Sequence, residues 1–238
     1  MAVIAMLTAG GSGNRMHQDI PKQFLTVNEK PVIVYTLEAF EKHPEIDAIA
    51  VACLDGWENV LSAYAQQFNI NKLKYIVPGG KTGQESIKNG LFELEKHFAP
   101  DDIVMIHDGN RPPLPPEVIS DSLRCARKNG NAVAVIPCAE VIMETEDGLI
   151  SSKTHERKNL RRTQTPHTFH LHDVCELYRE ADKTGITNAA AACQIMEELG
   201  RHVYFSIGSE KNLKLTTLDD IDIFKALLNT ERSSWLKS

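Results

Sequence analysis

The chain of 238 residues lacks the features that mark several broad classes of protein. No apolar run approaches the ~18 residues of a membrane-spanning helix. The apolar N-terminal segment is short and has no basic residues before it, which argues against a signal peptide. There is no positive excess either: the formal net charge is −6, whereas a general nucleic-acid binder carries a basic face. We therefore expect a cytoplasmic protein with neither a membrane nor a nucleic acid as its partner.

Cysteine is sparse, and its pattern argues against a zinc site. The five cysteines are odd in number and dispersed, with no C-x-x-C pair, which predicts reduced and mostly buried thiols. No H-E-x-x-H string occurs among the nine histidines. His167, His170 and His172 cluster in what reads as a loop and the start of a helix, and we expect them to be solvated rather than metal-bound.

Neither of the two best-known phosphate-binding strings is present. The P-loop string G-x-x-x-x-G-K-[ST] is absent, and the dinucleotide fingerprint G-x-G-x-x-G fails because Met16 stands where its third glycine belongs. The chain instead has a glycine-rich turn at residues 8–16, directly after an apolar strand at residues 2–7. Such a turn exposes backbone N–H groups to a polyanion, and Arg15 and Lys22 add positive charge beside it. These features predict a polyphosphate site; the alternative is a glycine-rich connection without a ligand.

Short apolar runs alternate with helical patterns along the chain. Strands are predicted at residues 2–7, 48–53, 74–77, 103–107, 132–137 and 202–207. Helices are predicted at residues 31–42, 57–68, 85–97, 116–128, 171–182, 189–199 and 221–228. This alternation predicts an α/β fold of a single domain, residues 1–238, with a Rossmann-like, mostly parallel sheet flanked by helices. Ligands of such sheets bind beyond the carboxyl ends of the strands.

One segment, at about residues 139–163, interrupts this alternation. It contains the hairpin signal Asp147-Gly148, followed by a polar and basic run at residues 153–162. This pattern predicts a β-arm that projects from the domain, although a charged run of this kind also fits a simple solvated arm. Because the apolar residues of a projecting arm must be buried somewhere, we expect a second subunit to cover them and predict a homodimer.

Asp108 follows the fourth predicted strand, at the same edge of the sheet as the glycine-rich turn. A carboxylate beside bound phosphates is suited to holding Mg²⁺, which prefers hard oxygen ligands. Capping the turn that follows is the alternative role of an isolated aspartate. Together with the glycine-rich turn, Asp108 predicts a Mg²⁺ site.

A second glycine pair, Gly79-Gly80, also follows a strand, and Ser86 stands in the first turn of the next helix. Backbone amides and a hydroxyl group suit the edge of a nucleobase. The alternative is a strand–helix junction in which the polar residues only cap the helix.

Lys214 lies near the C-terminus, just before a helix start. Thr217 and Asp220 there are close to a capping box, which gives both a structural role. The capping box does not explain Lys214. Its alternation with Leu213 and Leu215 points it away from those apolar neighbours and toward an anion.

Together these strings resemble the cytidylyltransferases that make CDP-linked polyols, a family that includes 2-C-methyl-D-erythritol 4-phosphate cytidylyltransferase and ribitol-5-phosphate cytidylyltransferase. The resemblance spans nearly the whole chain and rests on the order and spacing of residues 9–16, 21–23, 79–80, 107–108, 111–112, 164–166 and 212–216. Gly10-Gly11, the form of residues 164–166 and Thr216-Thr217 are slightly closer to the ribitol-phosphate branch.

The resemblance implies CTP and a phosphorylated small-molecule acceptor as substrates, Mg²⁺ as cofactor and a homodimer formed through the arm. It implies charge-stabilising roles in catalysis for Arg15, Lys22 and Lys214, and Mg²⁺ binding by Asp108. It assigns the acceptor to Arg157, Lys214 and the position of Val141. It implies nucleotide binding by Thr8, Ala9, Gly10, Gly11, Ser12, Gly13, Asn14, Gly80, Ser86 and Arg111.

The chain departs from the family pattern at four places. The family usually has Ala-Ala or Ala-Val where this chain has Gly109-Asn110, and an arginine where it has Gly83. Glu140-Val141 replaces Asp-Thr, and Asn188 replaces an aspartate. Because the last two changes fall toward the acceptor half, we predict an acceptor that is neither of the two named polyol phosphates. The expected acceptor is a related phosphorylated small molecule, like ribitol 5-phosphate, that serves as a capsule or cell-wall precursor.

Three other functions fit the same residues less well. One is 2-C-methyl-D-erythritol 4-phosphate cytidylyltransferase of isoprenoid synthesis, and another is a sugar-1-phosphate nucleotidylyltransferase, whose fold shares a glycine-rich opening. The third is a catalytically silent CTP-binding paralogue, motivated by Gly83 and Asn188.

Overall fold

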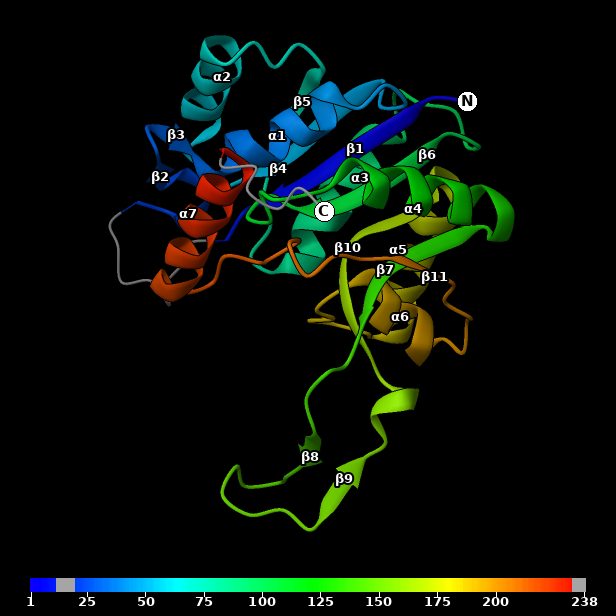
Figure 1. Cartoon of the computed structure of the whole chain (residues 1–238). Coiled ribbons are helices and arrows are strands. Elements are labelled where there is room, and N and C mark those ends of the chain that lie inside the picture. Colours follow the sequence, from blue (N-terminus) through cyan, green and yellow to red (C-terminus); the bar gives the residue numbers. More distant parts are fainter. Residues whose placement is uncertain (12–19, 233–238) are drawn as a thin grey trace.

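A seven-stranded sheet forms the centre of the protein (Figure 1). The computed structural model describes residues 1–11 and 20–232. The strand order is β11-β7-β10-β6-β1-β4-β5. The strands are β1 (Val3–Ala9), β4 (Ala48–Cys53), β5 (Leu73–Pro78), β6 (Ile103–Asp108), β7 (Asn131–Pro137), β10 (Arg161–His170) and β11 (Phe205–Ile207). Neighbouring strands are parallel except that β10 runs antiparallel to β6 and β7, so the predicted mostly parallel α/β sheet is confirmed.

Side chains of the central strands divide between two faces. Along β1, Ala5 and Leu7 join one buried cluster, whereas Ile4 and Met6 join another. Since successive side chains of a strand point to opposite faces, both faces must be covered. The helices that supply buried residues to the first cluster are α1 (Val32–Lys42), α2 (Glu58–Gln67) and α4 (Pro116–Asn129). Those of the second cluster are α3 (Gly83–Leu94), α5 (Leu171–Thr184) and α6 (Ala192–Glu198).

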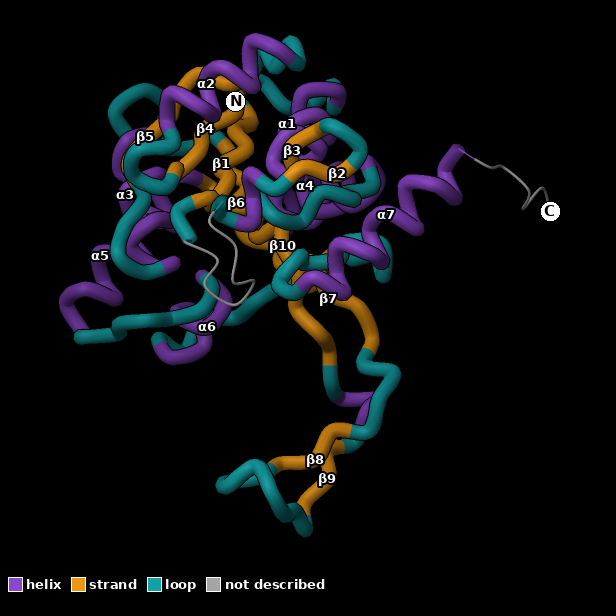
Figure 2. The backbone as a smooth tube through the Cα atoms, turned by 90° about the vertical axis from the view of Figure 1, so that its left-hand side faces the viewer, coloured by secondary structure: helices purple, strands orange, loops and turns teal. Residues whose placement is uncertain are grey.

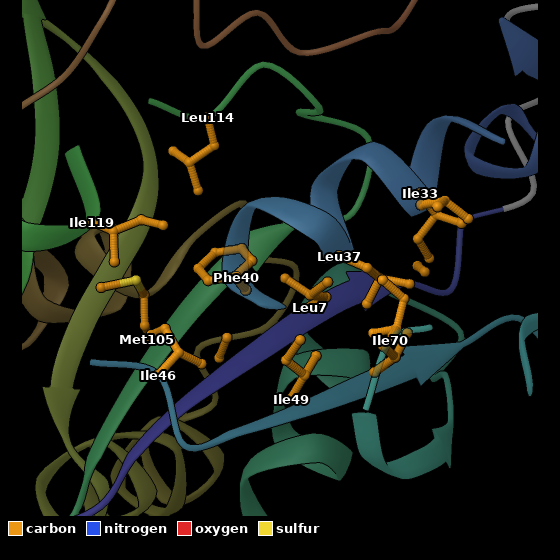
Figure 3. Close-up of a cluster of buried hydrophobic side chains, with 14 of the residues drawn as sticks. Leu7, Ile33, Leu37, Phe40, Ile46, Ile49, Ile70, Met105, Leu114 and Ile119 are labelled. Carbon is orange, nitrogen blue, oxygen red and sulfur yellow. The ribbon is translucent and has the colours of Figure 1, made fainter. Parts of the chain in front are cut away.

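Helix α1 connects the first cluster to the carboxyl ends of the strands. Leu37 and Phe40 of this helix pack beside Leu7 of β1 (Figure 3). On the same helix the buried Thr36 hydroxyl donates a 3.0 Å hydrogen bond to the Gly109 carbonyl, directly after β6. The helix therefore holds the turn at the end of β6 as well as the core.

The C-terminal helix α7 (Leu218–Arg232) begins with the predicted capping box. The Asp220 N–H donates to the Thr217 hydroxyl at 3.3 Å, and the Thr217 N–H donates to the Asp220 carboxylate at 2.8 Å. The Phe224 ring packs edge-on against Tyr35 of α1, with 5.1 Å between ring centroids. This contact fixes the segment before α7, which carries Lys214, against the body of the domain.

The sequence analysis was wrong about the segment around His167 and His170, which it read as a loop that enters a helix. This segment belongs to strand β10, residues 161–170, whose first three residues were predicted as the end of the arm. The strand lies between β6 and β7, and its buried positions include polar side chains. The Thr168 hydroxyl, for example, makes a 2.7 Å hydrogen bond with Ser122. Polar residues that are satisfied in this way break the alternation by which strands are recognised. His167 is only 2% exposed, so its predicted solvation is a further error.

Boundaries of other elements differ by a few residues. Strand β11 and helix α6 each begin three residues later than predicted, at Phe205 and Ala192. The remaining short elements are η2 (Lys22–Phe24), the β2 (Thr26–Val27) and β3 (Lys30–Pro31) pair, and η3 (Arg157–Asn159). Among the described residues, no helix has the length and apolarity needed to span a bilayer.

The predicted arm projects away from the domain between β7 and β10 (Figure 2). Its outer part is the antiparallel pair β8 (Ile142–Glu144) and β9 (Lys153–His155). Large apolar side chains are exposed along it, including Val141 at 65%, Leu149 at 86% and Ile150 at 78%. These side chains find no cover within the described part of the chain.

Candidate active site

Two glycine-containing turns touch one another at the carboxyl ends of β1 and β5. A Cβ atom built on Gly10 would lie 3.3 Å from Gly79 Cα and 2.9 Å from the Ser86 hydroxyl oxygen. A Cβ atom on Gly80 would lie 2.2 Å from Glu85 Cβ, so only glycine fits there. Ser86 holds the second turn, because its hydroxyl accepts a 2.9 Å hydrogen bond from the Gly80 N–H. The result is a surface of bare backbone of the kind that phosphates approach.

Gln23 fixes the first of these turns, a role that the sequence analysis did not assign. Its side chain is 2% exposed, and its amide nitrogen donates to the carbonyls of Ala9 at 2.7 Å and Gly11 at 3.1 Å. The neighbouring Phe24 stacks on Trp57, with ring centroids 4.5 Å apart. Lys22, the first residue of η2, is thereby attached to a fixed segment beside the glycine-rich turn. The only sequence signal for Gln23 was its place in the 21–23 string.

A pocket of about 450 Å³ opens at this edge of the sheet. It brings together nine predicted site residues: Thr8, Ala9, Gly10, Gly11, Lys22, Gly80, Ser86, Asp108 and Lys214. The sequence analysis assigned no role to its other lining residues, which are Gln23, Leu54, Lys81, Thr82, Gly83 and Asn110. Its volume is within the range of small-molecule sites. The predicted residues Ser12, Gly13, Asn14 and Arg15 lie outside the described part of the chain.

Asp108 lies between two cations at the mouth of this pocket. The Arg111 Nε atom is 2.9 Å from its Oδ2, and the Lys214 ammonium is 3.0 Å from each carboxylate oxygen. Burial alone would raise the pKa of the Asp108 carboxyl, but Lys214 and Arg111 outweigh that effect and hold the pKa well below its usual range. Asp108 is therefore ionised at neutral pH, with its charge balanced by Arg111, three residues further along the chain, and by Lys214, which is distant in the sequence.

Hydrogen bonds from residues outside the pocket lining hold the Arg111 side chain in place. Its Nη1 atom donates to the Asn212 carbonyl at 2.9 Å, and the Asn212 side chain donates to the Thr165 carbonyl at 2.7 Å. The Thr165 hydroxyl in turn accepts from the Asp108 N–H at 3.1 Å. Gln164 joins the same network by donating to the Ser209 carbonyl at 2.9 Å. Gln164, Thr165 and Asn212, to which the sequence analysis gave no individual roles, thus support the charged centre.

Two predicted acceptor residues lie outside the pocket lining of their own chain. Val141 is on the exposed arm, and the Arg157 guanidinium donates a 2.8 Å hydrogen bond to the Ala139 carbonyl at the arm's base. Arg157 lines a separate, open hollow with Pro137, Cys138 and Arg161. Within the described part of the chain, neither residue lines the pocket that holds Lys22 and Asp108.

The four departures from the family pattern occupy different places. Gly83 and Asn110 line the pocket, and among the described residues no atom lies within 4 Å of a Cβ built on Gly83, so these residues leave room for the family's arginine. Asn188 has a φ of 60°, a left-handed conformation that asparagine tolerates well. Its loop is tied to the pocket by Gln84, which accepts from the Ala189 N–H at 2.9 Å and donates to the Ile186 carbonyl at 2.8 Å.

The chemistry of the pocket fits a divalent cation that is shared with a polyphosphate. Among the described residues there is no cluster of three or more histidine, cysteine or acidic side chains, and Asp108 is the single carboxylate among the described lining residues. Mg²⁺ is commonly held by one or two carboxylates together with substrate phosphates and water. One ionised carboxylate, cations and bare amides are together suited to a triphosphate.

Comparison with known proteins agrees with this geometry. The sequence profile of the 2-C-methyl-D-erythritol 4-phosphate cytidylyltransferase family, IspD, matches residues 3–230. A ribitol-5-phosphate cytidylyltransferase of Lacticaseibacillus paracasei is 42% identical over 95% of this chain and 97% of its own. A 2-C-methyl-D-erythritol 4-phosphate cytidylyltransferase of Clostridioides difficile is 33% identical over 98% of this chain and 96% of its own.

The fold agrees as well. The crystal structure of 4-diphosphocytidyl-2C-methyl-D-erythritol synthase from Anaerococcus prevotii superimposes with a TM-score of 0.81, covering 96% of each chain at 25% identity. Sequence and fold therefore lead to the same conclusion: the chain belongs to the 2-C-methyl-D-erythritol 4-phosphate cytidylyltransferase family, IspD, and is a CTP-dependent nucleotidyltransferase.

Proposed function

We propose that the protein transfers CMP from CTP to ribitol 5-phosphate, giving CDP-ribitol and pyrophosphate. The observation that carries the proposal is the convergence of Lys22, Asp108 and Lys214 on one pocket floored by bare glycine backbone. The choice of acceptor is supported by the 42% identity to a ribitol-5-phosphate cytidylyltransferase, against 33% for a relative that acts in methylerythritol phosphate chemistry.

The reaction needs no nucleophilic side chain. A phosphate monoester is already an anion near neutral pH, and one of its oxygens forms a new bond to the α-phosphorus of CTP. The bond from that phosphorus to the oxygen bridging to the β-phosphate breaks, and pyrophosphate leaves with the electron pair. The protein must overcome the repulsion between two polyanions and stabilise the charge that grows on the phosphoryl and leaving oxygens.

Three described cations, Lys22, Lys214 and Arg111, have a place in this scheme. Lys22, on its fixed segment beside the glycine-rich turn, meets the triphosphate, while the bare amides of Gly10 and Gly11 bind its oxygens. Lys214 stands across the pocket and assists where the acceptor phosphate meets the α-phosphate. Arg111 keeps Asp108 ionised and oriented, and Gly80 with Ser86 borders the cytosine. Arg15 serves the triphosphate beside Lys22 in this proposal.

Asp108 is the residue that would hold Mg²⁺, in company with phosphate oxygens of CTP. The ion would neutralise part of the triphosphate charge and polarise the α-phosphoryl group. Because both carboxylate oxygens face cations in the free protein, Lys214 is placed to turn from Asp108 toward the phosphates when nucleotide arrives.

The acceptor half of the site is proposed to be completed by a second subunit. Arg157 lies on the arm, outside the pocket of its own chain, and the exposed apolar side chains of that arm need a cover. A homodimer in which the arms exchange would bury Leu149 and Ile150 and bring Arg157 to the partner's acceptor phosphate. Val141 lies on the same arm, so the partner also contributes to acceptor choice.

The decisive experiment is an acceptor and nucleotide panel followed by pyrophosphate release. The protein with Mg²⁺ is given CTP and ribitol 5-phosphate, 2-C-methyl-D-erythritol 4-phosphate or a sugar 1-phosphate, with unphosphorylated ribitol as the matched control. UTP, ATP and GTP then replace CTP. We expect release only with CTP and fastest with ribitol 5-phosphate.

Other outcomes would identify the alternatives. Fast turnover of 2-C-methyl-D-erythritol 4-phosphate alone would reject the ribitol proposal in favour of an isoprenoid enzyme. Preference for UTP with a sugar 1-phosphate would indicate a sugar nucleotidylyltransferase. Tight CTP binding without pyrophosphate from any acceptor would indicate a silent paralogue.

A further inference from the structure

Asn110 is a pocket residue for which the family resemblance supplies no role. It lines the pocket, its side chain is 5% exposed, and it stands where the family usually has alanine or valine. A buried amide is costly unless it is hydrogen-bonded, so its partner is informative.

Two hydrogen bonds join Asn110 to Leu215. The side-chain Nδ2 donates to the Leu215 carbonyl at 2.5 Å, and the Leu215 N–H donates to the Asn110 carbonyl at 2.9 Å. Alanine at this position would keep the second bond and lose the first. Leu215 is fully buried and directly follows Lys214, so the added bond acts on the backbone that carries this lysine.

The other end of this link is fixed to the core. The Gly109 N–H donates to the Thr8 carbonyl at 2.9 Å, and the Gly109 carbonyl accepts from Thr36 of α1 at 3.0 Å. A Cβ atom on Gly109 would lie 3.0 Å from that same Thr8 oxygen, so the turn passes close to β1. The backbone just before Asn110 is therefore fixed by hydrogen bonds to both β1 and α1.

The Lys214 side chain needs such support because it is long and flexible. The ammonium stays at Asp108 only if the backbone at residues 214–215 is fixed, because a moving backbone would let the side chain adopt many other conformations. We infer that Asn110 is a positioning residue of this protein: its amide fixes the backbone beside Lys214, so that the ammonium is held at Asp108 and delivered to the phosphates of CTP. The inference rests on the proposed function.

A double-mutant cycle on CTP binding tests this link. Affinity for CTP with Mg²⁺ is measured by titration calorimetry for the wild type, Asn110→Ala, Lys214→Ala and the double variant. Loss of one buried hydrogen bond is expected to weaken CTP binding about fivefold in Asn110→Ala. Because Asn110 acts through Lys214, the same substitution should change affinity less than about twofold in the Lys214→Ala background.

Two further variants separate positioning from general stability. Asn131→Ala is the matched control: this buried asparagine also bonds backbone, donating to the His202 carbonyl and accepting from the Tyr204 N–H, but it lies on β7 outside the pocket lining. It should lower the urea midpoint and leave CTP affinity unchanged. Asn110→Leu keeps about the same branched side-chain shape without the amide donor or any added charge and should reproduce the loss of Asn110→Ala, which guards against a folding defect in the alanine variant.

The outcomes are distinct. An equal loss of CTP affinity in both backgrounds, unchanged affinity in Asn110→Ala and Asn110→Leu, or unchanged affinity in Lys214→Ala would overturn the inference while the proposed function stands. Failure of the wild type to bind CTP would instead overturn the proposed function, and the inference with it.

Discussion

The Lys214 ammonium lies 3.0 Å from the Asp108 carboxylate, although 106 residues separate the two in the chain. Asp108 ends a central strand of the sheet, and Lys214 lies on the segment that leads into the last helix. The Lys214 side chain is 40% exposed, and water screens a pair with one exposed partner, so the ion pair by itself is weak evidence of a stabilising role. Its position at the edge of the pocket agrees instead with a charged centre prepared for a polyanion.

Asp108→Asn is expected to lower the rate constant kcat by about 100-fold or more, in line with losses of single electrostatic groups in active sites. The change removes the one carboxylate among the described lining residues and leaves Lys214 and Arg111 without their counter-charge. Pyrophosphate release measured across a range of Mg²⁺ concentrations checks this. Asp182→Asn, an exposed carboxylate paired with Lys88, is the control and should behave like wild type.

Lys22→Ala is expected to lower kcat by about 100-fold or more, because a fixed positive charge beside the triphosphate is lost. The control is Lys128→Ala, which removes an equal charge from the exposed end of α4. Wild-type turnover in Lys22→Ala would refute the role assigned to this lysine.

Gly80→Ala and Gly83→Ala form a matched pair within one turn of the pocket. A Cβ atom at Gly80 would collide with Glu85, whereas at Gly83 it would meet open space. We therefore expect Gly80→Ala to weaken CTP affinity at least about tenfold, because the added methyl group would strain the turn and displace the backbone that borders the pocket. Gly83→Ala should fold normally and retain CTP affinity within about twofold. Equal behaviour of the two variants in a binding titration would contradict this account of the turn.

Stability is expected to fall with acidification from about pH 6.5 toward pH 4. Burial lowers the pKa of His107 to about 3 and that of His167 to about 4, from an ordinary value of 6.5. Between these values the unfolded chain binds protons that the native protein does not, so each histidine removes up to about 1.4 kcal/mol of unfolding free energy per pH unit. Urea denaturation at pH 7, 6 and 5 measures the slope.

The histidine contribution can be isolated by substitution. His167→Gln should flatten the pH dependence of the unfolding free energy, because one buried titratable group is removed. His172→Gln changes an exposed residue at the start of α5 and should leave the slope as it is. A slope that is unaffected by His167→Gln would show that other groups govern acid unfolding.

Subunit exchange tests whether the arm serves the partner's pocket. Lys22→Ala and Arg157→Ala should each be nearly inactive alone, but a mixed dimer would contain one site with both residues intact. Random pairing of equal amounts then predicts about one quarter of the wild-type activity. Absence of any recovery after verified subunit exchange would place Arg157 and Lys22 in the same subunit's site or remove Arg157 from catalysis.

The sequence predicted most of the sheet because its central strands are apolar on both faces and its helices have one apolar side. Residues 48–53 were placed correctly at both ends for this reason. Strand β10 was missed because Gln164, His167 and Thr168 are polar yet buried, and their hydrogen-bond partners come from elsewhere in the chain. A local pattern of polar and apolar residues does not show which distant residues will serve as hydrogen-bond partners.

What the sequence determined by itself is the chemistry available: glycines next to strand ends, and the residue types at Lys22, Asp108 and Lys214. These follow from local patterns of period and composition. Only the tertiary structure decided that Arg111 and Lys214 share the Asp108 carboxylate, that Gln23 holds the glycine turn, and that Asn110 bonds the backbone next to Lys214. The bonds that Lys214 and Leu215 make to Asp108 and Asn110 join residues more than 100 positions apart. They form because crossover connections bring the carboxyl ends of parallel strands to one edge of the sheet.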